Sequence, residues 1–188
     1  MVGTDSSLRQ LSQAGAISGV DLVCAAAEVV PLRDHCVDLI IVSAALHWFD
    51  RPRFYAEARR VGRPGAILAV WSYYRSRIEP AIDAVLERYE EIVNPLWPPG
   101  FELNRSGYRD LDLPFEPLPW PRPEAQASMR LADLHQYVRT WSASQAWQRA
   151  HGTDPIDEIR ADLERAWGDP EMERTVHWPL HGAIARIR

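Results

Sequence analysis

The sequence of 188 residues contains no lysine, so all 21 of its basic residues are arginine. We interpret this bias as a base-composition preference of the source genome, because no folding requirement demands it. The chain also lacks an excess of positive charge: its formal net charge is −5 at pH 7. A protein that binds nucleic acid through its phosphates needs a cationic face. We therefore expect no nucleic-acid partner.

Cysteine is scarce as well, with only Cys24 and Cys36 in the chain. Two cysteines do not make the disulfide framework of a secreted domain, and we expect free thiols in a reducing cytoplasm. No uninterrupted apolar run reaches membrane-spanning length. The first residues also lack the basic stretch and apolar run of a signal peptide. These absences predict a cytoplasmic protein with no membrane partner.

Short apolar runs are abundant, and those at residues 2–4, 20–26, 37–43 and 65–72 predict strands. The last two are apolar almost without alternation, which is typical of parallel strands covered on both faces by helices. Between them, Asp50 can cap a helix, Pro52 fits its first turn, and Gly62 with Pro64 can end it. The pattern predicts a right-handed strand–helix–strand unit.

The remaining segments predict more helices than strands. A short helix is expected over 8–14, and longer ones begin at Pro80, near Leu131 and after Asp154, the last ending before Gly168. Strand character is expected within 113–118 and over 175–187. The proline-rich part between Asn94 and Pro123 also contains Trp97, Phe101, Phe115 and Trp120, and this density of aromatic residues favours an ordered lid over a flexible linker.

Two acidic residues follow predicted strands. Asp5 stands where an open α/β sheet binds ligands, and a carboxylate there can hold both hydroxyls of a ribose; taken alone, a helix cap is the stronger interpretation. Glu28 follows three alanines that would let a flat ring approach the backbone. Its carboxylate can accept from an exocyclic amine, although a solvated loop acid is the simpler alternative.

Other catalytic chemistry has less support. His47, in the segment that ends the third strand, can serve as a general base or only orient its loop. There is no G-x-S-x-G element for a serine nucleophile. His177 and His181 are four residues apart but are separated by Pro179, and His35–Cys36 has no partner at zinc-like spacing. We expect no metal site.

These motifs together resemble the class I S-adenosylmethionine-dependent methyltransferases, and within them the small-molecule branch of the trans-aconitate and type 11 methyltransferases. V-G-T-D-S-S resembles the second strand of the family with its ribose-binding acid, and A-A-A-E resembles the loop beside the adenine. V-D-L-I-I-V-S-A-A-L-H-W-F-D resembles the fourth strand, and E-A-R-R-V-G-R-P-G-A-I-L-A-V-W leads into the fifth. T-W-S-A, G-T-D-P and A-W-G-D-P are similar to later segments of this branch.

The resemblance implies a Rossmann-like α/β fold with a helical and aromatic cap, and S-adenosylmethionine as cofactor. It implies a partial cofactor-binding core at 1–74, with cap helices and closing strands of the same domain at 75–188. The implied cofactor-binding residues are Asp5, Ser6, Ala27, Glu28, Ala44 and Ala45. The implied pocket candidates beside the reacting groups are His47, Trp48 and Tyr73, and Arg75 or Arg77 can pair with a substrate carboxylate.

The sequence departs from the family at one place. The first strand of the family, its glycine-rich turn and the following helix are absent from these residues. We expect an N-terminally truncated chain whose sheet is completed by an upstream segment or by an oligomeric partner, or else a chain with impaired cofactor binding. The expected function is methyl transfer to a small molecule, with a carboxylate oxygen as the expected acceptor. The alternative is a non-catalytic methyltransferase-like remnant or binding module; a dinucleotide-dependent dehydrogenase would need the same missing turn.

Overall fold

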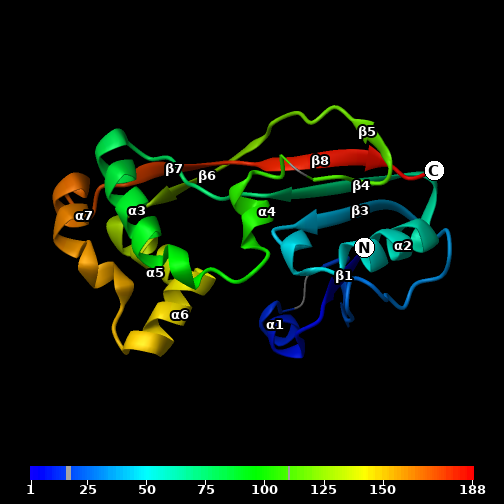
Figure 1. Cartoon of the computed structure of the whole chain (residues 1–188), viewed down its shortest axis with the longest axis horizontal. Coiled ribbons are helices and arrows are strands. Elements are labelled where there is room, and N and C mark those ends of the chain that lie inside the picture. Colours follow the sequence, from blue (N-terminus) through cyan, green and yellow to red (C-terminus); the bar gives the residue numbers. More distant parts are fainter. Residues whose placement is uncertain (16–17, 110) are drawn as a thin grey trace. The chain divides into compact units, whose positions relative to one another are not determined.

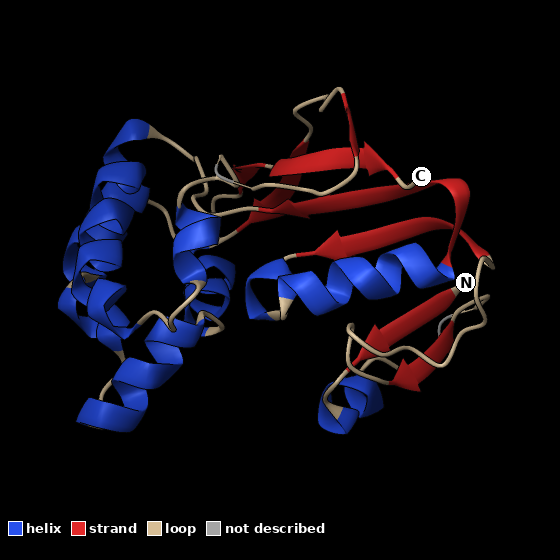
Figure 2. Ribbon diagram, turned by 45° about the vertical axis from the view of Figure 1, so that its right-hand side comes forward, coloured by secondary structure: helices blue, strands red, loops and turns tan. Residues whose placement is uncertain are grey.

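The computed structural model describes residues 1–15, 18–109 and 111–188 (Figure 1). These residues form two compact units. Unit 1 comprises residues 1–72, 108–121 and 182–188, and unit 2 comprises residues 73–107 and 122–181. Unit 1 contains mostly strands and unit 2 mostly helices (Figure 2). The division of the domain at residues 74 and 75 stays a prediction.

Unit 1 opens with a short parallel strand pair. Strand β1 (Val2–Asp5) pairs with β2 (Asp21–Cys24), and helix α1 (Leu8–Gln13) connects them. The hydroxyl of Ser7 caps this helix by accepting from the backbone N–H of Gln10 at 3.3 Å. Helix α1 buries none of its residues, and Leu8 is 71% exposed. The apolar face of α1 therefore lacks cover among the described residues.

A second sheet in unit 1 has the strand order β3–β4–β8–β5. Strands β3 (Val37–Ser43) and β4 (Gly62–Ser72) are parallel, and α2 (Arg51–Val61) connects them. The carboxylate of Asp50 caps α2, which confirms the predicted strand–helix–strand unit. Strand β8 (His181–Arg186) runs opposite to β4 (Figure 1), and β5 (Glu116–Leu118) is antiparallel to β8.

Two glycines of unit 1 fit specific backbone demands. Strand β4 begins at Gly62, three residues earlier than predicted, because Gly62 is extended directly after α2. Gly182 brings β8 against β4: a Cβ at this position would lie 2.1 Å from the carbonyl oxygen of Val70 and 2.8 Å from the Cα of Trp71. Such distances exclude any side chain at Gly182 without a backbone shift.

The environment of strand β3 differs from the sequence-based expectation. The run over 37–43 was expected to be covered on both faces, but Leu39 is 51% and Ile41 is 52% exposed. The two residues point to one face of the strand, and Val42, on the other face, is buried. Among the described strands, β3 pairs with β4 alone. One edge and one face of β3 are therefore uncovered.

Unit 2 is built on a helical core. Helix α3 (Pro80–Val93) packs with α5 (Leu131–Arg139), α6 (Ser142–His151), the 3-10 turn η3 (Pro155–Glu158) and α7 (Arg160–Trp167). The antiparallel strands β6 (Glu124–Met129) and β7 (Arg174–Pro179) complete it, with η2 (Asn94–Leu96) and α4 (Phe101–Arg105) after α3. Tyr89 and Trp167 are fully buried in the core.

The helix expected after Asp154 is interrupted in the structure. Asp154 accepts from the N–H of Ile156 at 3.1 Å, but η3 ends at Glu158, and the φ of −124° and ψ of −1° at the next residue, Ile159, are not helical. Helix α7 then begins at Arg160. Ile156, Ile159 and Trp167 are nonetheless all buried. The apolar spacing therefore identified these core residues correctly, although the segment forms a 3-10 turn and a shorter helix instead of one helix.

Candidate functional site

Unit 1 contains a cavity of about 460 Å³ between β1 and β3. Residues of β1, of the loop after β2, of β3 and of α2 line it. Ligands of open α/β sheets bind outside the carboxyl ends of strands. Three predicted cofactor-binding residues meet at such ends on this cavity: Asp5 is the last residue of β1, Ala27 follows β2 and Ala45 follows β3.

Asp5 serves the local backbone in part. One carboxylate oxygen, Oδ1, accepts from the N–H of Ser7 at 2.7 Å, so Asp5 fixes the turn that leads into α1. The side chain remains exposed. Asp5 is not the helix cap that was the alternative interpretation, because Ser7 caps α1. The ribose-binding role of Asp5 stays a prediction.

The other predicted adenine-side residues lie next to the cavity lining rather than in it. Glu28 Oε1 accepts from the N–H of Asp50 at 2.8 Å, which links the loop after β2 to the start of α2. The carbonyl of Ser6 accepts from the thiol of Cys24 at 3.7 Å. Ala44 directly follows β3 in a left-handed conformation with φ +50°, and its N–H donates to the carbonyl of Trp71 at 2.8 Å.

A polar clamp holds the loop after β2 against α2, and the sequence reasoning missed it. Glu57 Oε1 accepts from the N–H of Val30 at 2.7 Å, and Arg60 donates to the carbonyls of Leu32 and Val30 and to Asp34. Hydrogen bonds from Arg60 lower the pKa of Glu57. The i, i+3 spacing of Glu57 and Arg60 on a helix was the available signal. This clamp fixes the cavity wall that carries Val30 and Leu32.

His47 and Trp48 lie in the 3-10 turn η1 (Leu46–Trp48) after β3. Burial lowers the pKa of His47, so its imidazole is neutral at pH 7 and retains a basic nitrogen. Its ring centroid lies 4.9 Å from that of Trp48, which is 56% exposed. Tyr73, the third pocket candidate, belongs to unit 2, where its ring packs edge-on against Trp178 at 6.4 Å.

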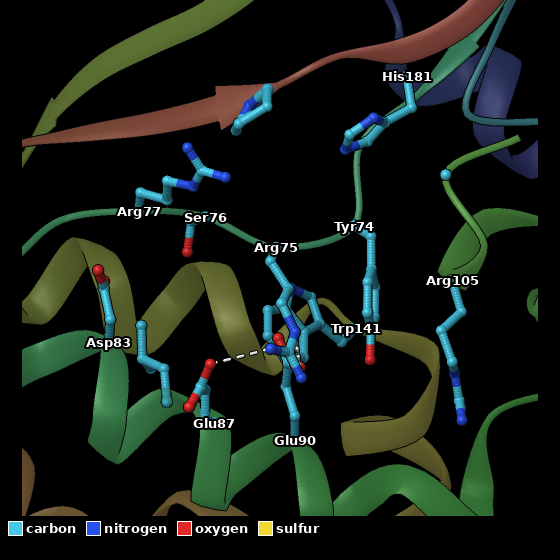
Figure 3. Close-up of a pocket in the computed structure, with 13 residues that line it drawn as sticks. Tyr74, Arg75, Ser76, Arg77, Asp83, Glu87, Glu90, Arg105, Trp141 and His181 are labelled. Atoms are coloured by element: carbon cyan, nitrogen blue, oxygen red, sulfur yellow. Dashed lines mark hydrogen bonds and ion pairs between the residues drawn. The ribbon is translucent and has the colours of Figure 1, made fainter. Parts of the chain in front are cut away.

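Unit 2 has its own pocket, of about 350 Å³ (Figure 3). The segment 74–77, which follows β4 after a single residue, lines it together with α3, Arg105, Trp141 and His181. Both predicted carboxylate-binding arginines, Arg75 and Arg77, line this pocket. Arg75 is already paired, with Glu87 at 2.9 Å and with Glu90 at 2.9 Å. Glu90 is buried, and burial raises its pKa despite the Arg75 charge.

Among residues 1–15, 18–109 and 111–188, no three His, Cys, Asp or Glu side chains gather in a way that could hold a metal ion. Within the same ranges, every helix is too short or too polar to cross a membrane.

The strand order, the crossover unit and the cavity at the strand ends define a Rossmann-like methyltransferase fold. The family model described as a methyltransferase domain matches residues 1–70. A Dictyostelium discoideum protein named as a methyltransferase is 32% identical over 194 residues, covering 99% of this chain and 73% of the relative. A solved structure from Anaeromyxobacter dehalogenans, described as a type II methyltransferase, has a TM-score of 0.89 and 39% sequence identity with this chain. The match covers 99% of this chain and 80% of the Anaeromyxobacter chain.

A third match is shorter. A ubiquinone/menaquinone biosynthesis C-methyltransferase from Acidiphilium cryptum is 31% identical over 96 residues, which is 50% of this chain and 38% of that enzyme. The chain belongs to the methyltransferase domain family of the class I S-adenosylmethionine-dependent methyltransferases. It is a methyltransferase by this membership, and the members of the family generally use S-adenosylmethionine.

Proposed function

We propose that the protein transfers a methyl group from S-adenosylmethionine to a carboxylate oxygen of a small molecule, as in the trans-aconitate branch that its motifs resemble. The observation that carries the proposal is the unit 1 cavity, which brings Asp5, Ala27 and Ala45 to neighbouring strand ends. The two small alanine side chains leave room for a flat ring, and the second oxygen of Asp5 can accept from ribose hydroxyls. These residues fit the nucleoside part of the cofactor.

The chemistry asks little of the chain beyond positioning. S-adenosylmethionine would supply a methyl group activated by a sulfonium centre: the acceptor oxygen would form the new C–O bond as the methyl C–S bond breaks, with S-adenosylhomocysteine as the leaving group. A carboxylate is already anionic at neutral pH and needs no general base, so alignment and exclusion of water are the main contributions of the protein. Neutral His47 in η1 can accept a proton if the acceptor carries one. The free thiols of Cys24 and Cys36 support a reducing, cytoplasmic location.

We also propose that a strand, a glycine-rich turn and a helix outside these residues complete the site, supplied by the same polypeptide or by a partner. The uncovered edge of β3 and the exposed side chains of Val2, Leu39 and Ile41 support this, because all three line the same cavity. The matched relatives are also longer: the chain spans 73% of the Dictyostelium protein and 80% of the Anaeromyxobacter structure. Backbone N–H groups of such a turn would face the methionine end of the cofactor.

The test is a methyl-transfer assay with the chain extended before Met1 by the proposed strand, glycine-rich turn and helix. We expect mass spectrometry to show a methyl ester of a di- or tricarboxylate in a panel of small acids, and loss of the product in an Asp5→Ala variant. An Asp21→Ala variant, changed at an exposed acid at the other end of the strand pair, serves as the control. Methylation of amines or phenols in the panel, with no ester formed, would contradict the carboxylate assignment.

A further inference from the structure

The pocket of unit 2 carries three arginines, and the structure gives two of them partners. Arg75 pairs with Glu87 and Glu90. Arg105 donates to the side-chain oxygen of Asn94 and lies 3.6 Å from Glu102. These two cations are therefore neutralised or bonded within the chain itself.

The acids of the pocket are occupied in the same way. Glu87 and Glu90 form ion pairs with Arg75. Asp83 Oδ1 accepts from the N–H of Ile78 at 2.8 Å and so fixes the start of α3. A cationic ligand would have to displace one of these interactions. The acids of the pocket thus give little reason to expect a cation.

Arg77 differs from the other two arginines. Its backbone is held by two hydrogen bonds with His177, of 2.8 and 2.9 Å, in an isolated antiparallel bridge. Within residues 1–15, 18–109 and 111–188, its guanidinium makes no hydrogen bond or ion pair; its charge only helps to lower the pKa of Glu124, which His177 and Gln126 already contact. Figure 3 shows Arg77 and His181 extending toward each other, while Arg75 extends toward Glu90.

We propose that Arg77 is the anchor for a carboxylate group of the methyl acceptor, and that Arg75 is a structural residue that closes the pocket floor. A guanidinium offers two parallel N–H donors to a carboxylate, and a fixed backbone reduces the entropy lost on binding. Trp141 and Leu86 supply apolar wall for the carbon part of the ligand. This inference rests on the proposed function, and it adds which arginine selects the acceptor.

The experiment is a calorimetric titration of the full chain with trans-aconitate, a tricarboxylate probe, at low ionic strength and without S-adenosylmethionine. Because Arg77 is exposed but lines a pocket, we expect Arg77→Gln to weaken binding by about five- to tenfold, more than a surface ion pair would. Arg77→Lys should recover part of the lost affinity, since it keeps the positive charge but not the two parallel N–H donors of the guanidinium. Arg149→Gln, which removes one exposed charge from α6 outside the pocket, should bind as the unchanged protein does.

Equal affinity of the unchanged protein and Arg77→Gln overturns the assignment, and so does a complete lack of trans-aconitate binding. An equal loss in Arg77→Gln and Arg149→Gln also overturns it, because it would show a general charge effect. A failure of the methyltransferase proposal is seen separately, as absence of cofactor binding by the extended chain, and it leaves this titration readable. Thermal unfolding of each variant shows whether the fold is intact.

Discussion

Ile41 gives the sharpest stability prediction, because the structure leaves half of this strand residue in water. A fully buried isoleucine or leucine changed to alanine costs about 2–5 kcal/mol. Ile41 is 52% exposed, so about half of that transfer and cavity cost is absent, and we expect Ile41→Ala to cost about 1–2 kcal/mol in the chain alone. Leu68 in β4 is fully buried, and Leu68→Ala should cost the full amount, about 2–5 kcal/mol.

Urea unfolding followed by circular dichroism measures both variants, in the chain alone and in the chain extended by the strand–turn–helix segment. We expect the added helix to cover the exposed face in the extended chain, so the cost of Ile41→Ala should rise there toward that of Leu68→Ala. Leu68→Ala should cost the same in both forms. An Ile41→Ala cost equal to that of Leu68→Ala in the chain alone would refute the reasoning, because the face of β3 would then already be covered.

Three further predictions concern the rest of the fold. Gly182→Ala should destabilise unit 1 by about 3 kcal/mol or more, because its Cβ would meet the Val70 carbonyl at 2.1 Å. The control variant Gly152→Ala, at φ +73° in open space, should cost only about 1 kcal/mol. Equal denaturation midpoints of the two variants would contradict this difference. Trp167→Ala removes a fully buried ring and should cost about 3–5 kcal/mol in urea unfolding, and a cost below about 1 kcal/mol would exclude it from the core. Burial raises the pKa of Glu90 in the folded state, so its contribution to stability is most favourable below the ordinary glutamate pKa and is lost as the pH rises through the raised value. The stability of the unchanged protein relative to Glu90→Gln should therefore fall as the pH rises above the ordinary glutamate pKa, and a rise with pH would contradict the assigned shift.

Local patterns predicted much of the fold. The apolar run at Val37–Ser43 matches β3, and Asp50 with Pro52 located the start of α2. Helix α6 and strand β6 were missed, because α6 begins at Ser142 without a side-chain cap and β6 is mostly polar. The exposure of Leu39 and Ile41 could not be predicted from their own residue types, since it depends on which elements are present to cover them.

The sequence predicted several residues that line the two cavities, but it did not predict which contacts their side chains make. The positions of Asp5, Ala27 and Ala45 follow from the strand ends, which the apolar runs marked. The pairing of Arg75 with Glu87 and Glu90 depends on how the segment after β4 lies on α3, and no local spacing encodes it. For the same reason, the sequence named Arg75 and Arg77 as equivalent candidates, and the ion pairs distinguish them.

The most direct test of the central claim is calorimetric titration with S-adenosylhomocysteine of the chain alone and of the chain extended by the strand–turn–helix segment. We expect these residues to supply the nucleoside side of the cofactor site and the added segment to supply the methionine side. The extended chain should therefore bind with a micromolar dissociation constant, and the chain alone at least about a hundredfold more weakly. An Asp5→Ala change in the extended chain should weaken the binding. Equal affinities for the two chains, or no binding by the extended one, would contradict the account.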